Sequence, residues 1–271
     1  MARVRGLCPP PAALYDWAVF PYHDENQTQR TPIVTMALIA INTIVWLLVQ
    51  GAGADLALAR SVCELGLIPG ELTLSVPPGE GFRMGDDVVC LTDPGRQTSH
   101  LLTSMFLHGS WMHLLGNMWF LWLFGNNVED SMTRSRFVAF YVLTGLAAAL
   151  AQVLAEPSSQ IPMVGASGAI SGVMGAYLVL FPRVRVYTIV PLGFFMQQMA
   201  LPAWVMLLYW AFLQLVSGVG SVVAEQSGGV AFWAHLGGFL AGLVLIKIFE
   251  RRDRVQAHMA GHWSPRGAGW R

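Results

Sequence analysis

Long apolar runs separated by shorter polar segments dominate this chain. The apolar runs cover residues 32–50, 111–124, 137–154, 166–181, 203–223 and 231–249. A helix needs about 20 mainly apolar residues to cross the roughly 30 Å hydrocarbon core of a bilayer. The pattern therefore predicts an all-α polytopic membrane protein, built as a bundle of six transmembrane helices.

The segments outside these runs divide the chain further. Residues 1–31 are polar and mixed, and we interpret them as an N-terminal tail. Residues 51–99 are rich in glycine, proline and charge, which favours a large extramembrane or interfacial loop within a single bundle over residues 32–249. Residues 250–271 are basic, with glycine and proline, and we expect a disordered tail.

Composition supports the membrane interpretation. Hydrophobic residues make up 54% of the chain and charged residues 12%, whereas soluble domains carry about 25% charged residues. The formal net charge is zero, so nothing indicates a nucleic-acid partner, and the lipid bilayer is the expected environment. The histidines lie in separate spans without cysteine or carboxylate at ligand spacing, so no metal or cofactor is expected.

The placement of Lys and Arg predicts an orientation. With a cytoplasmic N-terminus, thirteen of these residues fall in cytoplasmic segments, and three fall in the 51–99 loop. Because cytoplasmic loops carry the excess of positive charge, both termini should be cytoplasmic, as in a bacterial inner-membrane protein. Cys63 and Cys90 then share the outer loop, where an oxidising compartment allows a disulfide but does not require one.

A serine within the fourth apolar run is the first candidate for chemistry. Gly165-Ala166-Ser167-Gly168 opens this run, and Ser167 to Phe181 spans about 22 Å as a helix. If Phe181 lies near the cytoplasmic surface, Ser167 lies below the outer surface, at the floor of a cavity that opens outward. Small residues also occur where membrane helices merely pack, so the serine alone would favour a packing interpretation.

His235, in the sixth run, is the candidate base, since a serine hydroxyl needs a neighbouring base to become a good nucleophile. Gly238 and Gly242 follow at helical spacing on the same face, and Gly168 and Gly172 line the fourth run similarly. Two glycine-lined faces pack closely, which would bring His235 to Ser167. A histidine that only hydrogen-bonds between helices is the alternative.

His113 and Asn117, in the second run, are four residues apart and therefore share a helix face. Both side chains donate hydrogen bonds, which suits stabilisation of an oxyanion. Structural hydrogen bonding between helices is an equally good interpretation of this pair alone. His108 is either a third polar member of this group or an interfacial residue, and we favour the second interpretation.

Together these motifs resemble the rhomboid family of intramembrane serine proteases. The resemblance rests on His113-Leu114-Leu115-Gly116-Asn117, Gly165-Ala166-Ser167-Gly168 and Ala234-His235 with Gly238 and Gly242, and it covers about residues 32–249. It implies that Ser167 is the nucleophile and His235 the general base. It also implies an oxyanion hole formed by His113, Asn117 and the backbone N–H of Ser167.

The resemblance further implies substrates that are single-span membrane proteins, cleaved within or near the outer end of the transmembrane segment. They would enter between the second and fifth helices, so loosening the fifth helix at Trp210 should raise activity. Glu129 matches a structural glutamate of the family. Ser99 and His100 stand where the family often has Trp-Arg.

A second departure concerns the base. Ser171 stands where some family members have an aromatic residue stacked on the catalytic histidine, so the sequence does not say what orients His235. No acidic residue is placed to complete a Ser-His-Asp triad, and a Ser-His dyad is expected.

Two other classes of protein compete with a protease. A non-catalytic rhomboid-like protein that binds membrane proteins would lack the serine or the histidine, and this chain has both. A transporter or channel would show paired charges at mid-membrane and repeat symmetry, and neither is evident in the sequence. The sequence indicates neither a particular substrate nor an oligomeric state.

Overall fold

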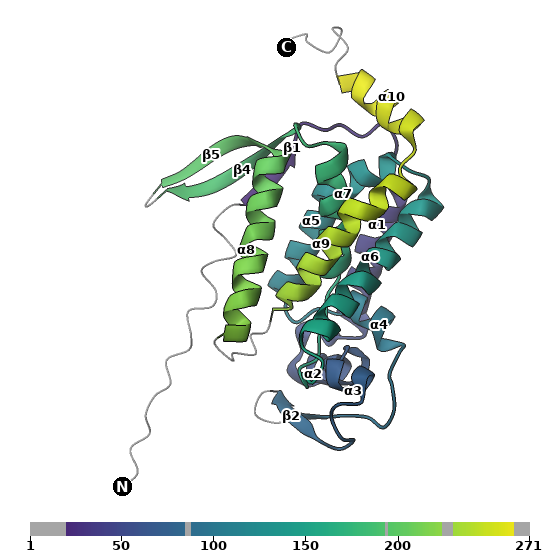
Figure 1. Ribbon diagram of the computed structural model, residues 1–271, viewed down its shortest axis with the longest axis vertical. Helices are drawn as coiled ribbons and strands as arrows, with labels where there is room; N and C mark the ends of the chain where they lie inside the picture. Colours follow the sequence, from purple (N-terminus) through teal and green to yellow (C-terminus); the bar gives the residue numbers. More distant parts are fainter. Residues whose placement is uncertain (1–19, 85–87, 193–194, 224–229, 263–271) are drawn as a thin grey trace.

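The computed structural model describes residues 20–84, 88–192, 195–223 and 230–262 (Figure 1). In chain order its elements are β1 (Phe20–Asp24), α1 (Ile33–Leu48), η1 (Gly51–Gly53), α2 (Asp55–Leu65), α3 (Pro69–Thr73), β2 (Gly81–Met84), β3 (Val88–Leu91), α4 (His100–Thr103), η2 (Ser104–Phe106), α5 (Trp111–Asp130), α6 (Arg134–Ala155), α7 (Ser167–Leu180), β4 (Arg185–Leu192), β5 (Phe195–Pro202), α8 (Ala203–Val223), α9 (Phe232–Phe249) and α10 (Arg252–His262). The fold is mainly helical.

Six helices of 14 to 22 residues correspond to the six apolar runs. Among the described residues, α6, residues 203–220 of α8, and α9 are long and apolar enough to cross a membrane. Helices α1 and α7 are apolar but shorter. Length and apolarity on their own thus identify three spans among the described residues.

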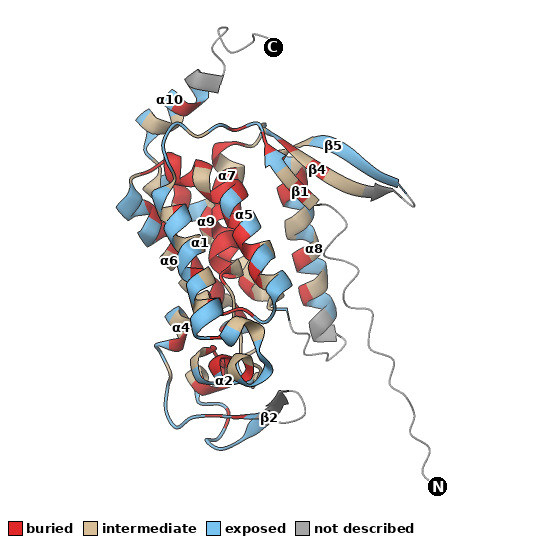
Figure 2. Cartoon of the chain, turned by 180° about the vertical axis from the view of Figure 1, so that it is seen from behind, coloured by how far each residue is buried: buried red, intermediate tan, exposed pale blue. Residues whose placement is uncertain are grey.

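Helix α7 lies at the centre of the bundle, where it contacts α5, α6 and α9 (Figures 1 and 2). Residues 168–177 are all buried. Its sequence, SGAISGVMGAYLVL, carries small residues on several faces, so neighbouring helices approach its backbone closely. The serine at its first position is therefore held by the most enclosed helix of the fold.

The strands correct the expectation of an all-α chain. Strands β1, β4 and β5 form an antiparallel sheet in the order β1-β4-β5, and β2 pairs with β3 in a separate hairpin. Strand β1 pairs with β4 from Phe20↔Ile189 to Asp24↔Val186. The sequence analysis missed this sheet because its first strand is far along the chain from the other two.

The described residues of the 51–99 segment form η1, α2, α3 and the β2–β3 pair, which lie at one end of the bundle (Figure 1). Cys63 and Cys90 form a disulfide that ties α2 to β3, with their Cα atoms 5.2 Å apart. At the edge of this segment, the buried Gln50 side chain accepts from the backbone N–H of His108 and donates to its carbonyl, each at 2.8 Å.

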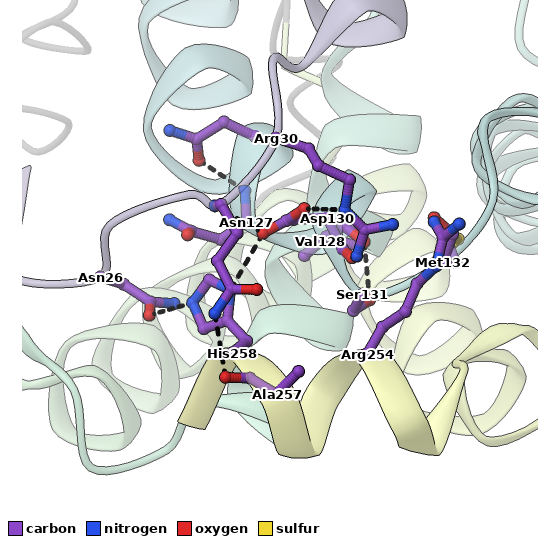
Figure 3. A network of polar contacts seen from close by, with 12 residues as sticks. Asn26, Arg30, Asn127, Val128, Asp130, Ser131, Met132, Arg254, Ala257 and His258 are labelled. Carbon is purple, nitrogen blue, oxygen red and sulfur yellow. Dashed lines mark hydrogen bonds and ion pairs between the residues drawn. The ribbon is translucent and has the colours of Figure 1, made fainter. Parts of the chain in front are cut away.

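The opposite end of the bundle holds a polar network that includes α10 (Figure 3). The buried His258 ring lies 3.1 Å from Asp130 Oδ2 and 2.6 Å from Asn26 Oδ1, and Arg30 pairs with Asp130 at 3.0 Å. The expectation of disorder throughout residues 250–271 is therefore wrong for α10. This helix forms because partners distant in the sequence hold it, which composition alone does not reveal.

Glu129, near the same end, caps the first long helix. Its carboxylate accepts from the backbone N–H groups of Val34 and Thr35, at 3.0 and 2.8 Å, and from the Thr35 hydroxyl at 2.8 Å. The first N–H groups of a helix have no partner within the helix, and an acidic side chain there also meets the positive end of the helix dipole. Glu129 thus joins the end of α5 to the start of α1.

Candidate active site

Ser167 and His235 come together from two adjacent helices. Ser167 is the first residue of α7, and His235 lies in the first turn of α9. The serine Oγ and the histidine Nε2 are 2.7 Å apart, a hydrogen-bonding distance. Because Ser167 begins its helix, its backbone N–H has no carbonyl partner one turn earlier within α7 and is available at the site.

Glycines on both helices make this approach close. A Cβ at Gly238 would overlap the carbonyl oxygen of Gly168, and a Cβ at Gly242 would overlap that of Gly172. Gly172 also faces the Thr144 side chain on α6, with no room for a side chain of its own. Any larger residue at these positions would push α9 away from α7, and with it His235 from Ser167.

Helix α8 supplies two contacts to His235 that the sequence analysis missed. Gln214 Oε1 lies 2.8 Å from His235 Nδ1, and the Trp210 ring is tilted against the imidazole with 6.1 Å between centroids. Ser171, four residues after Ser167, donates its hydroxyl to the carbonyl of Ser167 at 2.7 Å and does not stack on His235 as an aromatic residue would. The one feature of the sequence that pointed to these contacts was a glutamine one turn after a tryptophan, on a mainly apolar helix.

His113 reaches the site from α5 as a hydrogen-bond donor. Its Nδ1 accepts from the backbone N–H of Gly109 at 3.2 Å, so the ring proton sits on Nε2. That Nε2 points toward Gly165, where a Cβ would lie only 2.8 Å from it and 3.4 Å from the Ser167 hydroxyl. Gly165 also has a φ of +128°, a conformation that other residues rarely adopt.

Asn117, one turn along α5, has a side chain only 8% exposed. Within the described part of the chain, its buried Nδ2 has no hydrogen-bond partner. A buried amide donor without an acceptor is costly, so an acceptor supplied by a bound molecule would satisfy it. His113 and Asn117 therefore present two donors on the same side of Ser167.

His108 lies beside this pair rather than at an exposed interface. Its side chain is fully buried, and its ring packs edge-on against His113 with 5.2 Å between centroids. Burial lowers the pKa of His108 to about 3, so the ring is neutral.

All four predicted polar residues line one cavity of about 1030 Å³; they are Ser167, His235, His113 and Asn117. Met112, Gly116 and Phe120 of α5 line one side, and α8 lines another with Met206, Trp210 and Gln214. Pro69 and residues 161–165 extend the lining toward the end that carries the 51–99 segment. The cavity is large enough to admit a stretch of peptide backbone with its side chains.

The sequence of the chain matches known proteins of one family. The model of the rhomboid domain matches residues 95–252, more than half of the chain. The chain is 30% identical over 174 residues to Rhomboid protein 1, mitochondrial, of Saccharomyces cerevisiae, which covers 60% of this chain and 46% of the yeast protein. It is 33% identical over 145 residues to Rhomboid-like protease 5 of Toxoplasma gondii, which covers 52% of this chain and 15% of that protein.

A third relative is the Presenilin-associated rhomboid-like protein, mitochondrial, of Bos taurus, 29% identical over 154 residues. This match covers 54% of the chain and 36% of the bovine protein. The chain thus spans less than half the length of each of these three relatives. The region matched by the rhomboid domain, residues 95–252, contains the α5, α7 and α9 motifs and the helices between them. The chain therefore belongs to the rhomboid family of integral membrane proteins.

Proposed function

We propose that this chain is an intramembrane serine endopeptidase that works through a Ser167–His235 dyad. The observation that carries the proposal is the 2.7 Å separation of Ser167 Oγ and His235 Nε2, two residues that line the same cavity. Such a pair is what nucleophilic catalysis by serine requires. The match to the rhomboid domain supports the same reaction class.

In the proposed reaction, His235 Nε2 takes the proton from Ser167 as Oγ attacks the carbonyl carbon of a peptide bond. The carbonyl π pair moves to oxygen and forms a tetrahedral oxyanion. Its collapse breaks the C–N bond, and the leaving amine takes the proton from His235. Water then attacks the acyl carbon while His235 takes a proton from the water. The acyl C–Oγ bond breaks, His235 returns the proton to Ser167 Oγ, and the new carboxyl terminus is released.

The proposal assigns three donors to the oxyanion. They are His113 Nε2–H, Asn117 Nδ2 and the backbone N–H of Ser167, the last at the positive end of the α7 dipole. All are neutral, so none adds an ionised group to the membrane interior. Fixed donors in a site shielded from bulk water stabilise developing charge more than water-exposed donors do.

The proposal includes six membrane spans, formed by α1, α5, α6, α7, α8 and α9, with both termini cytoplasmic. The network of Asp130, Arg30 and His258 then lies at the cytoplasmic end, and the 51–99 segment lies outside. The Cys63–Cys90 disulfide suits an oxidising space such as the bacterial periplasm. We therefore assign the chain to a bacterial inner membrane.

The proposed substrates are single-span membrane proteins, cut within or near the outer end of the spanning helix. They would enter between α5 and α8, whose side chains line two sides of the cavity. A peptide bond inside a helix is shielded by its own hydrogen bonds, so helix-breaking residues near the cut would help. The dyad would then meet an extended stretch of backbone.

Labelling with a fluorophosphonate probe tests the nucleophile, because the probe reacts with activated serines. We expect wild-type protein to be labelled on Ser167, and Ser167→Ala and His235→Ala to lose the label. Mass spectrometry of the labelled peptide distinguishes Ser167 from Ser171, which lies one turn away. Equal labelling of wild type and Ser167→Ala would overturn the assignment, and a well-folded wild type that never labels would favour the non-catalytic binding protein.

A further inference from the structure

We propose that Gln214 is the positioning residue of the dyad, and that it makes the geometry of the dyad depend on where α8 sits. This inference rests on the proposed function. The sequence offers no acidic partner for His235, and position 171 is a serine and not an aromatic residue. The open question is therefore which residue orients the His235 ring. The contact that carries the inference is the 2.8 Å separation between Gln214 Oε1 and His235 Nδ1.

The protons at the site determine the role of the amide. Ser167 must donate its hydroxyl proton to His235, so Nε2 carries no proton at rest, and the ring proton sits on Nδ1. That buried N–H requires an acceptor, and Gln214 Oε1 supplies it. If the acceptor were lost, the imidazole could rotate or shift its proton to Nε2, which would turn the base away from the serine.

A neutral amide suits this position in a membrane protein. Gln214 is only 7% exposed and lies on a mainly apolar helix. A carboxylate there would cost several kcal/mol to desolvate unless a cation paired with it. The amide fixes the orientation of His235 without that cost, although it offers less stabilisation to the imidazolium than a carboxylate would.

The helix that carries Gln214 differs from the helices that carry the dyad. Glycine contacts interlock α7 and α9, so Ser167 and His235 have a fixed backbone separation. Among the long helices, α8 packs chiefly against α9 and makes a smaller contact with α7, and it stands at the side of the bundle in Figure 1. Its outer face, with Leu208, Phe212 and Val219, is exposed.

A small movement of α8 would therefore break the contact between Gln214 and His235 and impair the dyad. The backbone positions of Ser167 and His235 would stay the same. A hydrogen bond of 2.8 Å weakens quickly on lengthening, and a displacement of about 1 Å takes it beyond the usual range. Helix α8 also forms one side of the proposed entry path. Substrate would then enter while α8 is displaced, when Ser167 is less reactive. The serine would become reactive once α8 has moved back and Gln214 again contacts His235.

The test compares Gln214→Met, which keeps the length of the side chain but removes the acceptor, with Gln214→Glu, which restores an acceptor oxygen whether or not it is ionised. Phe212→Met, on the exposed face of the same helix, is the matched control. The readout is the rate of fluorophosphonate labelling of Ser167. The probe is small and needs no entry of a transmembrane substrate, so this rate reports on the dyad.

We expect Gln214→Met to label about 10- to 100-fold more slowly than wild type, Gln214→Glu to recover most of that loss, and Phe212→Met to match wild type. With a membrane substrate, Gln214→Met should lower kcat and leave KM nearly unchanged. Wild-type labelling rates in Gln214→Met would overturn the inference. So would a loss that Gln214→Glu does not restore while its melting temperature stays that of wild type.

A second measurement needs no variant of Gln214. ¹⁵N spectra of histidine-labelled protein in micelles, with His235 assigned by its loss in His235→Ala, report which ring nitrogen carries the proton. The inference requires the proton on Nδ1, and a proton on Nε2 at neutral pH would contradict it. Failure of the proposed function itself would appear separately, as labelling of wild type that Ser167→Ala does not abolish.

Discussion

A Cβ at Gly165 would lie 2.8 Å from His113 Nε2. This nitrogen bears the ring proton and points toward the start of α7. Gly165 thus lets a hydrogen-bond donor on α5 reach the start of α7. Its φ of +128° further limits this position to glycine. The contact links a feature of the sequence, the glycine two residues before Ser167, to the chemistry of the site.

From this contact we predict that Gly165→Ala lowers the rate of substrate cleavage by at least about 100-fold, since it displaces one oxyanion donor and strains the turn. Gly79→Ala is the matched control, because Gly79 also has a positive φ, of +84°, but faces open space. Cleavage by purified protein in micelles measures both variants. Equal losses in the two variants would mean that backbone strain, and not the His113 contact, matters at Gly165.

The contact between α7 and α9 gives a prediction about stability. Gly242→Ala should lower the free energy of unfolding by about 1–3 kcal/mol, because the added methyl group meets the backbone of Gly172. Gly220→Ala, on α8 with open space around it, should be neutral or slightly stabilising. Thermal unfolding in a single detergent compares the two variants. A Gly242→Ala protein as stable as wild type would show that the helices are not in the contact described.

Asp24, on β1, predicts a pH dependence of stability. Its Oδ2 accepts from the Tyr177 hydroxyl at 2.5 Å and from Asn127 Nδ2 at 3.0 Å, and burial raises its pKa from 3.8 to about 6. The folded protein thus holds the Asp24 proton more tightly than the unfolded chain. Its stabilising contribution is full below pH 3.8 and is lost as the pH rises through 6, with an upper limit of about 3 kcal/mol.

Asp24→Asn should therefore remove part of the decline in stability between about pH 4 and pH 7. Asp55→Asn, at an exposed site on α2, should keep the wild-type pH dependence. Melting temperatures across this range provide the measurement. If wild type and Asp24→Asn show parallel curves, Asp24 does not titrate within the window that its burial implies.

Trp210 tests entry of the substrate beside α8. Its ring lies 6.1 Å from that of His235 and 5.8 Å from that of Phe239, so it forms part of the contact between α8 and α9. Trp210→Ala weakens this contact and should favour displaced positions of α8. The rate of cleavage of a single-span substrate, divided by the rate of fluorophosphonate labelling, should rise about 2- to 10-fold.

Phe212→Ala, on the exposed face of α8, is the control for Trp210→Ala, and its ratio of the two rates should stay at the wild-type value. An unchanged ratio in Trp210→Ala would argue against entry at this side of the cavity. The ratio is informative because loosening α8 also reduces support for His235. A fall in cleavage alone would therefore not separate entry from chemistry.

Much of the helical framework follows from the sequence because long apolar runs have few alternatives in a membrane. The predicted run 203–223 coincides with α8, and the run 166–181 contains α7. Glycines at helical spacing also indicated which faces of α7 and α9 could meet. These features depend on periodicity along one segment, which a single sequence displays directly.

The features that the sequence did not reveal depend on contacts between distant segments. Strand β1 pairs with β4 across more than 160 residues, and α10 is held by the contacts of His258 with Asp130 and Asn26. Gln214 reads in the sequence as one tolerated polar residue in an apolar helix. Its contact with His235 becomes evident only in the structure, where α8 and α9 lie side by side.

Cleavage of a single-span substrate in proteoliposomes tests the central claim most directly. The assay compares wild type with Ser167→Ala and His235→Ala at equal amounts of folded protein, and mass spectrometry locates the cut. We predict that wild type alone cleaves the substrate, at a site within or near the outer end of its transmembrane segment. Cleavage that persists in either variant, or wild-type protein that binds the substrate without cutting it, would contradict the Ser167–His235 dyad.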